Sequence, residues 1–148
     1  MLKRMHAVAG VVGFLLIAVF WTSTVWVELA GAEAAIAAVK SAIRSAMIVL
    51  VPTLALVGVT GMRLGRKRRD APALAKKRRM PIITLNGLLV LVPAAFFLAA
   101  KAEAGEFDRL FYGVQTLELI AGAVNLVLIG LNVRDGVAMA RTRRFLAQ

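Results

Sequence analysis

Three polar side chains recur at seven-residue intervals near the C-terminus: Glu118, Asn125 and Asn132. They belong to a longer series whose members are alternately three and four residues apart. The series is Asp108, Phe111, Gln115, Glu118, Gly122, Asn125, Ile129, Asn132 and Gly136. Residues at these spacings lie on one stripe of an α-helix. We call this series the polar stripe.

The segment that carries the polar stripe is long enough to cross a bilayer, and it contains no Lys, Arg or Pro between Leu110 and Val133. At 1.5 Å per residue, Glu118 and Asn132 lie about 21 Å apart along the axis. The hydrocarbon core is roughly 30 Å thick. Because an amide or carboxylate facing lipid would lack hydrogen-bond partners, we expect the stripe to face protein or a wet cavity.

A carboxyl group inside a membrane is rare and is typical of a functional site. Glu118, assisted by Gln115, is therefore a candidate exchangeable proton site. Asn125 and Asn132, together with Asn86 on the preceding apolar segment, are expected to cluster and to continue a polar route inward. The alternative is structural, since Asn and Gln side chains also hydrogen-bond neighbouring helices to one another.

Glu28 and Arg44 are candidates for an outer mouth. In an antiparallel helical hairpin they should come to similar depth, where they could attract an anion or simply form a hydrated ion pair. Residues 34–45 between them favour a helix, and we expect them to stand above the hydrocarbon or at the interface.

His6 is the only histidine, and it lies at the inner boundary of the first apolar segment. Its imidazole could ligate the iron of haem b, as in a membrane electron carrier, or it could be a polar residue among lipid headgroups. A second ligand would come from a methionine at the same end or from the histidine of a second subunit. The methionines at that end are Met5, Met62, Met80 and Met139.

The composition indicates an integral membrane protein. The chain has 148 residues, of which 60% are hydrophobic, and no cysteine. Its mean hydropathy is +0.79. Four segments are long enough to span a membrane, at about 7–29, 46–64, 81–100 and 110–133. We predict an all-α fold: one four-span transmembrane domain over residues 1–148, built as a four-helix bundle.

The net charge is +11, and the basic residues are concentrated in segments that four spans would place on one side of a membrane. Most of the 19 basic residues lie at the N-terminus, in the linker 63–79 and in the tail 134–148. This positive-inside distribution predicts cytoplasmic termini, an interfacial tail and contact with anionic headgroups, in a membrane such as the bacterial inner membrane. Nucleic-acid binding is not expected, because no aromatic residues are interleaved with the charges.

Two prolines interrupt the predicted spans. Pro52 removes the hydrogen bond to the Ile48 carbonyl, and Pro93 frees the Leu89 carbonyl. Pro52 favours a kink, whereas the carbonyl that Pro93 frees needs a partner or lines a cavity. In a transport protein both prolines would allow helix movement.

The motifs of soluble enzymes are absent: the sequence has no P-loop, no HExxH and no GxGxxG. The favoured hypothesis is a binding or translocation site for a proton or small polar solute. The alternatives are a haem-b electron-transfer protein that uses His6, and a scaffold subunit of a larger membrane complex. A homodimer with the polar stripe at its interface fits each of them.

Overall fold

The structure is a computed structural model that describes residues 1–66 and 69–145, with the side chains of residues 30 and 139–145 outside the description. The prediction of a basic interfacial tail therefore lies partly outside the described residues, as do the side chains of Met139, Arg141, Arg143 and Arg144.

The described chain is all-helical, as predicted, and contains no strand. The helices are α1 (Leu2–Ala30), α2 (Glu33–Gly65), α3 (Ala71–Asn86), the π-helix η1 (Gly87–Leu91), α4 (Val92–Glu103) and α5 (Arg109–Phe145). Because α3, η1 and α4 follow one another without a break, the described residues form four long helices.

Each of the four long helices is apolar enough to cross a membrane, with mean hydropathies from 1.8 to 2.3 over its most apolar stretch. Large apolar side chains remain exposed around the bundle, as is expected where the surrounding medium is lipid. Examples are Val8, Ile48, Leu89 and Ile120, each more than half exposed.

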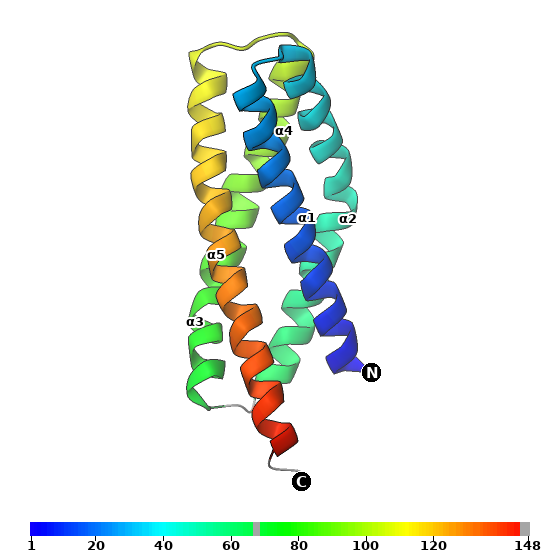
Figure 1. Ribbon diagram of the computed structural model, residues 1–148, viewed down its shortest axis with the longest axis vertical. Coiled ribbons are helices and arrows are strands. Elements are labelled where there is room, and N and C mark those ends of the chain that lie inside the picture. The colour runs from blue at the N-terminus through cyan, green and yellow to red at the C-terminus, as the bar shows by residue number, and fades with distance from the viewer. Residues whose placement is uncertain (67–68, 146–148) are drawn as a thin grey trace.

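The four helices run alternately up and down, and each packs on two antiparallel neighbours (Figure 1). α1 contacts α2 and α5, whereas α4 contacts α2 and α5 from the other side. Two short turns close one end of the bundle, with Gly31 at φ 73° and Gly105 at φ 71°. This backbone conformation favours glycine. The N-terminus and the last described turn of α5 lie at the opposite end (Figure 1).

The two prolines have different effects on their helices. Pro52 lies inside α2, which continues without a change of helix type. Pro93 lies two residues after the end of η1, in the first turn of α4, and the intervening Val92 N–H bonds to the Gly87 carbonyl, five residues back. The π-helical turn is a local adjustment of the kind that such an interruption favours.

The apolar core forms two clusters. One lies toward the turn end of the bundle and contains Val27, Ile36, Leu98, Ala102 and Phe111. The other lies at mid-height and contains Ile17, Ile43, Met47, Leu50 and Ala95. Lys40 falls between Ile36 and Ile43 along α2, so a cation lies where the two clusters meet.

Candidate functional site

From Phe111 to Asn132 the polar stripe faces the inside of the bundle, as its spacing predicted, whereas Asp108 at its start is exposed. Gln115, Asn125 and Asn132 are buried at 5% exposure or less. The side chain of Glu118 is 14% exposed. These four side chains therefore lie inside the bundle and not against its surroundings.

Glu118 forms an ion pair with Lys40, which the sequence analysis had not assigned to the site. Lys40 is fully buried, and its Nζ donates to Glu118 Oε2. Gln115 Nε2 donates to the same oxygen at 3.3 Å. The pair joins α2 to α5 and places opposite charges in the interior, between two apolar clusters.

A second carboxyl group, Glu28 on α1, lies within the electrostatic range of Lys40 and Glu118. Its Oε1 is buried and has no hydrogen-bond partner among the described residues, and the same holds for Gln115 Oε1. We call Glu28, Lys40, Gln115 and Glu118 the charged site. It contains two carboxyl groups and one ammonium group, and two of its acceptor atoms have no donor.

A cavity of about 60 Å³ adjoins Glu118 on the side of the mid-height core cluster. Its other polar lining comes from Trp21 and Thr24, and the rest is mainly apolar. The cavity is large enough for one or two water molecules. Trp21 closes one wall, since its Nε1 donates to the Leu119 carbonyl at 2.9 Å.

The predicted outer mouth does not form as expected. Arg44 pairs with Glu103 on α4, through contacts of 2.8 Å and 2.6 Å, and not with Glu28. The reason is the short turn: α2 already begins at Glu33, so Arg44 lies eleven residues below its start. Glu28 instead lies at the charged site.

A signal for Lys40 was present in the sequence. Ile36, Lys40, Ile43, Met47 and Leu50 are alternately four and three residues apart, and all five are buried. A single cation in an apolar helical stripe must find a partner inside the protein, because an unpaired buried charge is costly. The stripe on α2 was therefore the counterpart of the polar stripe on α5.

The predicted cluster of three Asn residues forms only as a pair. Asn86 Nδ2 donates to Asn125 Oδ1 at 2.9 Å and to the Ala121 carbonyl at 2.8 Å. Asn132 is separate: it accepts from Arg79 Nη1 at 3.3 Å, and Arg79 also pairs with Asp135 at 2.6 Å. Seven residues of helix separate Asn132 from Asn125, about 10 Å.

His6 connects α1 to α2. Its Nδ1 lies 2.9 Å from Thr60 Oγ1, and that hydroxyl donates to the Leu56 carbonyl at 2.6 Å. The hydroxyl therefore accepts from a protonated Nδ1. Gly61 makes room for the ring, since a Cβ there would lie 3.1 Å from His6 Cε1. These contacts explain His6 by packing, and they add no support to the haem alternative.

A comparison of this chain with known protein families, with curated proteins and with solved structures found no match, so its function has to be inferred from its own residues.

Proposed function

We propose that this is an integral membrane protein whose charged site binds or translocates a proton or a small polar solute. The observation that supports it most directly is the pair of buried oxygens without a donor, Glu28 Oε1 and Gln115 Oε1, beside the ion pair of Lys40 and Glu118.

The charge balance of the site favours a proton or another species rich in hydrogen-bond donors. Lys40 compensates one carboxylate, which leaves the second without an ion-pair partner of its own among the described residues. A buried acceptor without a donor costs about 1–3 kcal/mol, and an uncompensated charge costs more. A proton on Glu28 removes the charge, and a water or solute N–H group can satisfy the remaining acceptor.

The cavity beside Glu118 gives the site room for water, through which a proton could reach the carboxyl groups. Under the proposed orientation, with the basic linker and both termini in the cytoplasm, the charged site lies in the outer half of the bundle. Lys40 is seven residues below the start of α2, about 10 Å. The mid-height cluster of Ile17, Ile43, Met47, Leu50 and Ala95 then separates the site from the cytoplasmic half.

We assign the Asn pair to packing and not to the site. Both acceptors of Asn86 Nδ2 lie on α5, one a side chain and one a carbonyl, so Asn86 holds the third long helix to the fourth. A solute that took these hydrogen bonds would have to break that contact first.

The test is proton flux into proteoliposomes that hold a pH-sensitive dye, driven by a potassium diffusion potential. We expect flux above that of empty liposomes, and its loss in Glu28→Gln and in Glu118→Gln. Glu103→Gln is the matched control, because it removes a carboxylate from an exposed ion pair and should leave the flux unchanged. Flux that survives both site substitutions would rule out translocation through the charged site.

If the charged site binds a proton without translocating it, infrared spectroscopy should detect the band of a protonated carboxyl group. A pH titration of the reconstituted protein should show this band and lose it in Glu28→Gln. Because Glu118→Gln leaves Lys40 unpaired, the double variant Lys40→Gln/Glu118→Gln serves as a folded comparison. Absence of both flux and band from the wild-type protein would overturn the proposal.

A further inference from the structure

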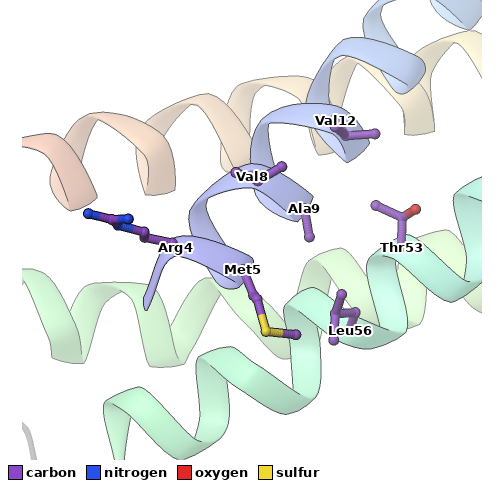
Figure 2. Close-up of a pocket in the computed structure, with 7 residues that line it drawn as sticks. All are labelled: Arg4, Met5, Val8, Ala9, Val12, Thr53 and Leu56. Carbon is purple, nitrogen blue, oxygen red and sulfur yellow. The ribbon is translucent and has the colours of Figure 1, made fainter. Parts of the chain in front are cut away.

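A groove on the outside of the bundle runs between α1 and α2 near the N-terminus of α1 (Figure 2). Its lining shares no residue with the charged site. Its volume is about 440 Å³, and it is open to the surroundings along its length. Ala9 is the buried residue of its floor, whereas Val8 and Val12 of α1 and Leu56 of α2 are exposed along its edges.

The charged and apolar residues of the groove are separated along its length. Arg4, Val8 and Val12 follow one another at intervals of four residues, so they lie in a row along α1 over about 12 Å. Figure 2 shows Arg4 at one end of this row and Val12 at the other. The charged end is thus the end near the N-terminus, and the apolar end points toward the middle of the bundle.

The polar groups of the groove identify what could fill it. Thr53 contributes the only hydroxyl of the lining, and this hydroxyl already donates to the Val49 carbonyl at 2.7 Å. Arg4 is exposed and makes no ion pair within the described part of the chain. A ligand of the groove therefore needs an apolar chain and one anionic group at its end, and it needs no other polar atom.

We propose that this groove is a binding site for an anionic phospholipid of the bilayer, with an acyl chain along Val8 and Val12 and the phosphate on Arg4. A guanidinium group binds phosphate oxygens through a fork of N–H donors. The order of charge and apolar surface matches that of a lipid lying parallel to a membrane helix, with its headgroup at the interface. The inference relies on insertion of the bundle into a membrane but not on the proton site.

The experiment is native mass spectrometry of the purified full-length protein, titrated with phosphatidylglycerol or with phosphatidylcholine of the same acyl chains. We expect one molecule of phosphatidylglycerol to be retained preferentially, and about a fivefold loss of that preference in Arg4→Gln. Lys3→Gln is the matched control, since Lys3 is the neighbouring cation but does not line the groove. It should keep the retained lipid.

A second readout locates the acyl chain. Phosphatidylglycerol with a photoreactive group in one chain should label peptides that contain Val8 or Leu56, and Val8→Trp should reduce this labelling by filling the groove. Equal retention of the two lipids, equal losses in Arg4→Gln and Lys3→Gln, or labelling spread over exposed residues of α5 would overturn the proposal. Proton flux in Arg4→Gln should remain that of the wild-type protein, which separates this site from the charged site.

Discussion

The Lys40 ammonium donates to the Glu118 carboxylate across the interior of the bundle, although 78 residues separate them in the sequence. The contact joins the first helical hairpin, α1 and α2, to the second, α3 to α5. Because Lys40 is fully buried, its ammonium depends on the Glu118 carboxylate to compensate its charge.

Removal of one partner should therefore destabilise the protein more than removal of both. Lys40→Met leaves a buried carboxylate without its cation, at an expected cost of about 3–5 kcal/mol in the free energy of unfolding. The double variant Lys40→Met/Glu118→Met should recover most of this loss, since an apolar pair of similar volume is often neutral or stabilising. Denaturant unfolding in detergent, followed by circular dichroism, measures the difference.

The control for this series is Arg44→Met, which breaks the exposed pair with Glu103. Exposed ion pairs contribute about 0–1 kcal/mol, so its effect should be small. If Lys40→Met were no more destabilising than Arg44→Met, the buried pair would not exist in the folded protein.

The helices and the inward direction of the polar stripe could be predicted because both depend on one segment at a time. The alternation of three and four residues from Phe111 to Asn132 fixes a face on a single helix, whatever its neighbours are. The cost of exposing Gln115 or Asn125 to lipid then fixes which way that face turns. The structure confirms both steps.

The partners of the charged side chains could not be predicted in the same way, because they depend on the register between helices. That register is set by where each turn ends. A turn of two residues at Gly31 makes α2 begin at Glu33, which brings Lys40 into the interior and moves Arg44 toward Glu103. The expectation for residues 34–45 concerned only their depth in the membrane, so it did not predict that Lys40 would be buried inside the bundle.

Gly122 should be required for the contact between α5 and Trp21. A Cβ at Gly122 would lie 2.9 Å from Trp21 Cδ1, and the indole is held in place by its bond to the Leu119 carbonyl. Gly122→Ala should therefore cost about 1–3 kcal/mol in the free energy of unfolding. Denaturant titration checks this value, and Trp21 fluorescence should shift with the displaced ring.

Gly130 on the same helix provides the comparison, because a Cβ there meets nothing within 4 Å. Gly130→Ala should be neutral or should stabilise α5 by up to about 1 kcal/mol, since alanine has the higher helix propensity. Similar stability of the two variants would show that α1 and α5 do not approach closely at Trp21.

The Asn pair should stabilise the bundle without carrying the solute. Asn86→Leu removes the donors to Asn125 and to the Ala121 carbonyl, and we expect a cost of about 0.6–1.7 kcal/mol, from the average to the largest value for interhelical hydrogen bonds in membranes. Asn125→Leu should cost a similar amount, and the double variant less than the sum of the two. A double-mutant cycle of unfolding free energies measures this coupling. Strict additivity would show that the two side chains do not interact in the folded protein. Loss of proton flux in a stable Asn86→Leu protein would show that Asn86 acts in the flux and not only in packing.

Asp108 should make the stability of the turn before α5 dependent on pH. The Lys101 ammonium, 2.6 Å from Oδ2, holds the pKa of this carboxyl below its ordinary value, and the Phe111 N–H, 2.8 Å from Oδ1, acts in the same direction. A carboxyl group whose pKa is lower in the folded state stabilises the protein above its unfolded pKa of about 3.9. That contribution is lost as the pH falls through the folded value.

The substitution that isolates this charge is Asp108→Asn, because an Asn side chain can still accept the Phe111 N–H as a helix cap. The melting temperature of the wild-type protein should exceed that of the variant near neutral pH, and the difference should shrink as the pH is lowered below about 4. Thermal melts over this range measure the difference. Glu106→Gln is the comparison. Glu106 is also exposed and lies 3.0 Å from Lys101 Nζ, but the helix N–H of Phe111 is capped by Asp108 and not by Glu106. A difference between Asp108→Asn and wild type that stayed constant with pH would mean that shape, and not charge, gives Asp108 its effect.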